Sequence, residues 1–304
     1  MSEFDHVGWN EVVAMGALTG IRVLDLSRVL AGPWCSQVLA DLGADVVKVE
    51  RVGRGDDTRA WGPPYMKDAQ GNETQEASYY QSSNRNKRSV AVDIATEKGQ
   101  EVVRALAAES DVLIENFKAG SLTKYRLDYA SLSRINPRLV YCSITGFGQT
   151  GPRAQQPGYD FIIQGIGGLM SITGERDGVP GGGPQKVGVA VTDVMTGLYS
   201  VIAIQAALLA RENTGRGQHC DMALLDVQVA ALGNQGQNYL STGVSPGRYG
   251  NAHANIVPYN SFRASDKDFI IACGNDSQFA ALCDAIGLPE LSADPRFSKN
   301  ENRG

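Results

Sequence analysis

The first two-thirds of the chain alternates short apolar runs with segments of helical periodicity. The runs are rich in Val, Ile and Leu, and the segments between them repeat apolar residues at helical spacing. Strands that are apolar on both sides need helices on both faces of their sheet. The alternation therefore predicts an α/β fold with a Rossmann-like parallel sheet. The expected strands are 21–27, 44–50, 89–94, 111–117 and 139–148, and the expected helices include 34–43 and 97–109.

The composition changes near "STGVSPGRYGN" (241–251), a stretch rich in Gly, Pro and Ser that is typical of a linker. Beyond it, "NIVPYNSF" and "FIIACGN" predict short strands, and 277–286 predicts a helix. We therefore expect a large α/β domain over residues 1–243 and the start of a smaller α+β domain over residues 244–304. The chain ends in the polar stretch "RFSKNENRG" without a closing helix or strand, and we interpret it as a piece of a longer protein.

Charge and hydropathy restrict the partners of the protein. The net charge of −5 argues against nucleic acid, although local patches could still hold a small anion. The N-terminal "MSEFDHVGWNEVV" lacks the basic and apolar parts of a targeting signal. The longest apolar stretch, Leu198 to Ala210, is too short to cross a bilayer. These features predict a cytoplasmic protein without a membrane partner.

The cysteines and histidines predict neither disulfides nor a metal site. The five cysteines form no C-x-x-C pair, so we expect them to be buried as small apolar side chains in a reducing compartment. The three histidines are far apart in the sequence and lack the spacing of metal ligands.

The common cofactor fingerprints are absent from the sequence. The turn after the first expected strand reads "SRVLAGPW" and lacks the G-x-G-x-x-G that lets a backbone approach a pyrophosphate. Neither a P-loop nor a G-x-S-x-G nucleophile motif is present. The chain therefore has the pattern of an α/β enzyme that uses none of these devices.

Two basic clusters lie beside the ends of expected strands, one after 44–50 and one before 89–94, and they allow two interpretations. Either they hold phosphates by charge-assisted hydrogen bonds beside nearby aromatic rings, or they are solvated loops. The sequence favours neither over the other. The clusters contain Arg51, Arg54 and Arg59 in the first, and Arg85, Lys87 and Arg88 in the second.

Three polar residues at the ends of expected elements allow a structural and a functional interpretation. Asp193 stands between "VGVAV" and a long apolar helix pattern, where an Asp is usually the N-cap of the helix, yet it could also be a nucleophilic carboxylate. Asp160 is expected to cap the helix that follows it. Asn116 ends a buried strand, where it could open a turn or contact a ligand.

Several blocks in a fixed order resemble the class III CoA-transferase family, which includes formyl-CoA transferase. They cover roughly residues 18–300. Their wording is most similar to the dicarboxylate branch, such as succinate–hydroxymethylglutarate CoA-transferase. The blocks include "LTGIRVLDLSRVLAGPWCSQVLADLGADVVKVERVGRGDDTR", "SSNRNKRSVAVDI", "DVLIENFKAGSL", "INPRLVYCSITGFGQTGP", "GYDFIIQGIGGLMSITG", "GVAVTDVMTG" and "TGRGQHCDMALLD".

The resemblance implies a transferase that moves CoA from an acyl-CoA, such as succinyl-CoA, to a carboxylic acid. It implies that Asp193 is the catalytic carboxylate, acting through an aspartyl anhydride and an aspartyl-CoA thioester, with coenzyme A as substrate and no other cofactor. Tyr159 and Asp160 would support the acyl pocket. The positions implied to bind CoA are Arg28, Val29, Leu30, Ala31, Arg51, Val92, Asn116, Phe117, Lys124 and Tyr125.

Two departures from related sequences guide the choice of reaction. Formyl-CoA transferase carries His and Gln where this chain has Arg28 and Leu30, which implies a different acyl acceptor and argues against oxalate. Related racemases carry a catalytic His where this chain has Tyr159. A racemase or dehydratase on the same fold, or an inactive CoA-binding fragment, stays an alternative. The resemblance also implies that full-length subunits form an interlocked homodimer.

Overall fold

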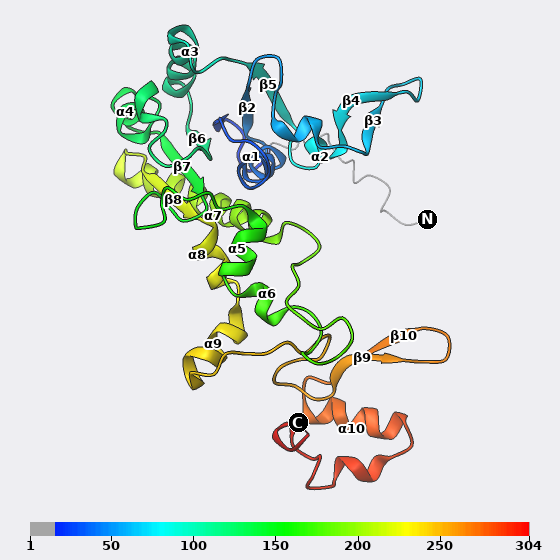
Figure 1. The fold of residues 1–304 in the computed structure, drawn as a ribbon. Coiled ribbons are helices and arrows are strands. Elements are labelled where there is room, and N and C mark those ends of the chain that lie inside the picture. The colour runs from blue at the N-terminus through cyan, green and yellow to red at the C-terminus, as the bar shows by residue number, and fades with distance from the viewer. Residues whose placement is uncertain (1–15, 304) are drawn as a thin grey trace, which may run out of the picture. The chain divides into compact units, whose positions relative to one another are not determined.

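A computed structural model describes residues 16–303 and contains a six-stranded sheet in which every pair of neighbouring strands is parallel (Figure 1). The strand order is β5-β2-β1-β6-β7-β8. The strands β3 (Tyr65–Lys67) and β4 (Glu73–Ala77) form a separate hairpin. When they are left out of the numbering, the order of the large sheet becomes 3-2-1-4-5-6, the doubly wound order of a Rossmann fold. The strands are β1 (Arg22–Asp25), β2 (Asp45–Glu50), β5 (Lys87–Ala91), β6 (Val112–Glu115), β7 (Val140–Thr145) and β8 (His219–Ala223).

Helices cover both faces of this sheet, as the apolar strands require. Val23 packs in one buried cluster with residues of α1 (Ala31–Asp41) and α7 (Val191–Thr214). The next residue, Leu24, packs in a second cluster with residues of α3 (Glu97–Ala108) and α4 (Tyr129–Ile135). Successive side chains of a strand point to opposite faces, so each face builds its own core. The predicted Rossmann-like α/β fold is confirmed.

The strand order reverses between β1 and β6. In a doubly wound sheet, the chain leaves these two strands toward opposite faces, which opens a crevice at their carboxyl ends. The segment after β1 contains Arg28, and the segment after β6 begins with Asn116. A ligand site is therefore expected where these two segments meet.

The described chain divides into two compact units, and the large sheet belongs to the first. One unit holds the described residues up to Ile163 together with Val189–Val229, and the other holds Gln164–Gly188 and the residues from Ala230 onward. The sequence-based boundary after residue 243 lies inside the second unit. The first unit also contains η1 (Asp57–Ala60), β3 (Tyr65–Lys67), β4 (Glu73–Ala77), α2 (Ser78–Gln81), η2 (Thr123–Tyr125) and most of α8 (Leu224–Ala230).

The second unit lacks the large sheet and is built from short elements. Its antiparallel hairpin (259–263 and 268–272) and the following helix (276–285) occupy nearly the same residues as the strands and the helix predicted for this region. The helix α5 (Asp160–Ile166) runs from the first unit into the second. The other elements are α6 (Leu169–Ile172), α9 (Gly233–Thr242), β9 (Tyr259–Arg263), β10 (Asp268–Ala272), α10 (Asp276–Ala285), η3 (Pro289–Ser292) and η4 (Asn300–Asn302).

Helix α7 is longer than the sequence suggested. It has 24 residues and is long and apolar enough, by those criteria alone, to cross a membrane. The expectation considered Leu198 to Ala210 alone and was therefore wrong for the helix as a whole, because residues 191–197 and 211–214, among them the apolar Val191 and Met195, are helical as well. One side of α7, which includes Val201, Ile204 and Ala207, is buried in the core beside α1 and the sheet.

All five cysteines are free and buried, as predicted. Within residues 16–303, no three His, Cys, Asp or Glu side chains gather in a way that could hold a metal ion. The N-terminal segment in which we found no targeting signal lies outside the described residues.

Helix α7 approaches α1 closely at Gly197. A Cβ atom at this position would lie 2.8 Å from the Ala31 carbonyl oxygen and 3.1 Å from the Trp34 Cβ. We predict that Gly197→Ala lowers the free energy of unfolding by about 1–3 kcal/mol, because overpacking outweighs the better helix propensity of Ala. The change is measured as a lower Tm in thermal unfolding followed by circular dichroism.

Gly165→Ala is the matched control for this prediction. Gly165 is also helical, but a Cβ there would meet only the Met170 sulfur, at 3.7 Å. It should leave stability unchanged or raise it by up to about 1 kcal/mol. Equal Tm changes in the two variants would contradict the close approach at Gly197.

Candidate active site

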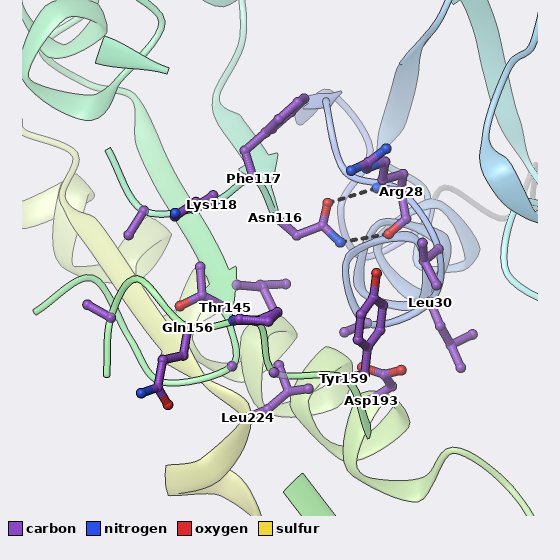
Figure 2. A pocket seen from close by; sticks show the side chains of 18 of the residues that line it. Arg28, Leu30, Asn116, Phe117, Lys118, Thr145, Gln156, Tyr159, Asp193 and Leu224 are labelled. Carbon is purple, nitrogen blue, oxygen red and sulfur yellow. Dashed lines mark hydrogen bonds between the residues drawn. The ribbon is translucent and has the colours of Figure 1, made fainter. Parts of the chain in front are cut away.

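A cavity of about 430 Å³ lies at the carboxyl ends of β1, β6 and β7, where the sheet topology predicts a ligand site (Figure 2). It brings together segments that are far apart in the sequence, namely the turn after β1, the turn after β6 and the start of α7. The predicted site residues that line it are Arg28, Val29, Leu30, Ala31, Asn116, Phe117, Tyr159 and Asp193.

A second cavity of about 370 Å³ shares Arg28 and Phe117 with the first. The other four residues predicted to bind CoA line it: Arg51, Val92, Lys124 and Tyr125. All the predicted site residues except Asp160 therefore line one of two cavities with a common wall. The sequence reasoning missed Lys118, Gln155 and Gln156, which also line the first cavity. Their positions beside Phe117 and shortly before Tyr159 were the available signal.

Asp193 does not cap the helix that contains it. It is the third residue of α7, after the N-cap residue Ala190. No strand precedes it, because residues 187–190 take irregular conformation. Among the described residues, its carboxylate accepts no hydrogen bond and forms no ion pair, and it lines the first cavity, as Tyr159 also does (Figure 2). The structure therefore removes the capping interpretation for Asp193.

The N-terminal amides of α7 bind a carboxylate from another segment. Asp160 Oδ1 accepts hydrogen bonds from the backbone N–H of Thr192 at 2.8 Å and of Asp193 at 3.2 Å. We expected Asp160 to cap its own helix, but it is the first residue of α5 and its side chain caps α7 instead. This contact could not be predicted from the sequence, because about thirty residues separate Asp160 from the start of α7.

Burial raises the pKa of Asp193 to about 7, and the charge of Asp160 adds to the effect. A buried carboxylate loses part of its hydration, and a second carboxylate nearby further disfavours its ionised form. Perturbed acids of this kind gather at functional sites, although structural networks also produce them. Asp193 thus changes its protonation state near neutral pH.

The turn after β1 is held in an unusual backbone conformation. Val29 has a φ of 73°, which is unfavourable for a β-branched residue. Asn116 Oδ1 accepts from the Arg28 N–H at 3.0 Å, and Asn116 Nδ2 donates to the Arg28 carbonyl oxygen at 2.6 Å (Figure 2). Both carboxylate oxygens of Asp56 lie 3.2 Å from the Val29 nitrogen. Such strain persists only where the surroundings impose it, and it is common at functional sites.

Cations of both basic clusters form ion pairs with nearby carboxylates. Arg59 pairs with Glu50 and Glu76. The second cluster is paired as well: Arg85 with Asp41, Arg88 with Asp45, and the buried Lys87 with Asp25. The interpretation of this second cluster as a phosphate site was therefore wrong, because its cations bind carboxylates of α1, β1 and β2. In the described part of the chain, Arg51 and Lys124 form no ion pair, so both are available to an anion in the second cavity.

Comparison with known proteins agrees with this architecture. The model of CoA-transferase family III matches residues 18–304. The chain therefore belongs to CoA-transferase family III, an enzyme family, as the resemblance implied. It is 56% identical over 286 residues to a succinate–glutarate CoA-transferase of Agrobacterium fabrum, which corresponds to 94% of this chain and 70% of that protein.

Two further relatives extend the comparison. The chain is 46% identical over 290 residues to the succinyl-CoA:glutarate CoA-transferase of Mus musculus, covering 95% of this chain and 64% of that protein. A crystal structure of a CaiB/BaiF family protein from Brucella suis superimposes with a TM-score of 0.82 and 56% identity, covering 95% of this chain and 74% of that one. The chain thus spans about two-thirds of the length of its relatives.

The raised pKa of Asp193 predicts a pH-dependent effect of Asp193→Asn on stability. The pKa lies near 7 in the folded protein and near 3.8 when the chain is unfolded. Ionisation therefore destabilises the fold progressively as the pH rises from about 4 to 7, and the penalty is constant above that. We expect the variant to have a higher Tm than the wild type, by a margin that grows between pH 5 and 7 and levels off at pH 8.

The control for this measurement is Asp226→Asn, which changes an exposed carboxylate of α8. Its Tm difference from the wild type should be small throughout this pH range. A margin for Asp193→Asn that did not change with pH would show that Asp193 is ionised without penalty in the folded protein.

Proposed function

We propose that the protein transfers CoA between a dicarboxylyl-CoA, such as succinyl-CoA, and a dicarboxylic acid, with Asp193 as the nucleophile. The observation that carries this proposal is the Asp193 carboxylate, which has no partner among residues 16–303, in a cavity that adjoins a second one. In that second cavity Arg51 and Lys124 likewise form no ion pair with these residues. A nucleophile must expose an oxygen to its substrate, and a CoA ester needs cations for its phosphates.

The proposed reaction begins when an Asp193 oxygen attacks the thioester carbonyl carbon and expels the CoA thiolate. This forms a mixed anhydride between Asp193 and the donor acyl group. The thiolate then attacks the Asp193 carbonyl carbon, which releases the donor acid and leaves an aspartyl-CoA thioester. Each covalent intermediate retains the activation of the original thioester, so the exchange needs no ATP.

The second half repeats these steps in reverse order with the acceptor acid. Its carboxylate attacks the aspartyl thioester and again expels the CoA thiolate, which forms a second anhydride. The thiolate attacks the acceptor carbonyl carbon, and the new acyl-CoA leaves with Asp193 restored as a carboxylate. Because the pKa of Asp193 is about 7, the nucleophilic form predominates only above neutral pH.

The two cavities suggest how a CoA ester would lie. We propose that Arg51 and Lys124 bind the phosphates in the second cavity, with Tyr125 beside the nucleotide. The pantetheine arm would follow residues 28–31 across the common wall and bring the thioester to Asp193 in the first cavity. The side chain of Asn116 is already bound to the Arg28 backbone, so we assign it to holding this path rather than to direct recognition.

A dicarboxylic acid is supported by the names of the relatives and by the cations of the first cavity. Both Arg28 and Lys118 line it, but their pairing differs. Within the described residues Lys118 forms no ion pair and could attract a second carboxylate, whereas Arg28 pairs with Asp57 at 3.0 Å and would have to exchange that partner. The absence of a further cofactor, the interlocked homodimer and the cytoplasmic location stay predictions from the sequence and the resemblance.

The test is Asp193→Ala in the whole protein, assayed with succinyl-CoA and a panel of acceptors that includes glutarate, mesaconate and oxalate. Removing a covalent nucleophile should lower kcat by at least about 10³-fold. In the wild type, hydroxylamine should convert Asp193 to its hydroxamate only when an acyl-CoA is present, as read by peptide mass spectrometry. Asp226→Ala, which changes an exposed residue of α8, should keep full activity.

Three outcomes would contradict the proposal. Full activity of Asp193→Ala would remove Asp193 as the nucleophile. Exchange of the α-proton of an acyl-CoA with solvent deuterium, without an acceptor acid, would indicate a racemase. Calorimetric CoA binding by a wild-type protein that turns over no acyl-CoA would indicate a binding protein.

A further inference from the structure

Asp160 occupies a position that determines where the Asp193 carboxylate can go. Its Oδ1 accepts from the backbone N–H groups of the second and third residues of α7, Thr192 and Asp193. The N-cap residue of α7 is Ala190, which has no side-chain group to bind them. These amides would otherwise lack intrahelical partners, as the first amides of every helix do.

Without Asp160, the carboxylate that remains within the first turn of α7 is that of Asp193 itself. An acidic side chain in the first helical turn readily folds back onto the free amides of the helix N-terminus. A hydrogen bond from a backbone amide to a charged carboxylate is stronger than one to a neutral acceptor. Such a bond competes with a pose in which the carboxylate projects into a cavity.

We propose that Asp160 is a positioning residue for Asp193: by binding the N-terminal amides of α7, it leaves the Asp193 carboxylate free to face the thioester. This inference rests on the proposed function, since it concerns the readiness of the nucleophile. It assigns Asp160 no contact with substrate, in keeping with its absence from the walls of both cavities.

A second contact keeps the start of α7 in place from another direction. The Thr192 hydroxyl donates to Gln228 Oε1 at 2.5 Å, and both residues are fully buried. The backbone of the first turn is therefore held on one side by α8 and on the other by Asp160. Because these contacts fix the backbone at the start of α7, the direction of the Asp193 carboxylate depends on its side-chain rotamer.

The charge of Asp160 has a further consequence for the nucleophile. The groups that face Asp193 are Asp160 at the start of α5, Tyr79 of α2, and Tyr159, with Arg28 and Lys118 in the same cavity. Burial contributes most to the raised pKa of Asp193, and Asp160 is its nearby anion. Removing the Asp160 charge while keeping an oxygen acceptor should therefore lower the pKa of Asp193 without freeing the helix amides.

The experiment compares Asp160→Asn with Asp160→Ala in the whole protein. Asn keeps an oxygen that can accept from Thr192 and Asp193, so we expect kcat at pH 8.5 to stay within about fivefold of the wild type. The acidic limb of its pH–rate profile should move to lower pH. Ala frees the amides, and we expect kcat to fall at least about 100-fold, with the KM for acyl-CoA and the calorimetric Kd for CoA changed less than threefold.

A stability cycle tests the same inference without turnover. The Tm gain from Asp193→Asn at pH 8 should be lost in the Asp160→Ala background, because the freed amides can then bind the ionised Asp193 carboxylate. In the Asp160→Asn background the gain should only be smaller than in the wild type, because one source of repulsion is gone. A Tm gain in the Asp160→Ala background equal to that in the wild type would overturn the positioning role, and an unchanged gain in the Asp160→Asn background would overturn the coupling between the two carboxylates.

The kinetic outcomes separate this inference from the proposed function. A wild-type kcat retained by Asp160→Ala, or equal losses in a folded Asp160→Asn and Asp160→Ala, would overturn the positioning role. A wild type that transfers no CoA would overturn the proposed function instead, and the stability cycle would then decide whether Asp160 positions Asp193.

Discussion

The site depends on a buried ion pair between Lys48 of β2 and Asp56 of the following loop. Their charged atoms lie 2.9 Å apart, and the two side chains are 1% and 0% exposed. Two buried charges cost more in lost hydration than their attraction returns unless further hydrogen bonds satisfy them. Here Lys48 also donates to the Ser27 carbonyl oxygen, and Asp56 accepts from Val29 and Thr58. The pair therefore fixes the turn after β1 that forms a wall of both cavities.

Two further contacts at the site follow the same principle. The backbone of Arg28 is bound by Asn116, and the start of α7 is bound by Asp160. In each case a polar side chain from a distant segment satisfies backbone groups that local structure leaves open. Asp193, in contrast, is left without a partner among the described residues and faces the cavity.

Residues that looked alike in the sequence separate clearly in the structure. Arg51 and Arg59 belong to one basic cluster, yet Arg59 is bound to Glu50 and Glu76 while Arg51 lines the second cavity. Asp160 and Asp193 both stand at the start of helices, yet the first caps the helix that contains the second. Periodicity and spacing describe a residue's own element, and they contain no information on which distant group lies beside it.

The sequence by itself determined the layered α/β architecture, because apolar runs that alternate with amphipathic segments can bury their side chains only as a parallel sheet between helices. Its ordered motifs also determined the family, which the family model and close relatives bear out. Only the tertiary structure decided that Asp193 is not a cap. That decision required the Asp160 carboxylate to reach the amides of α7 from another segment, and a hydrogen bond depends on where atoms lie in space rather than on their order along the chain.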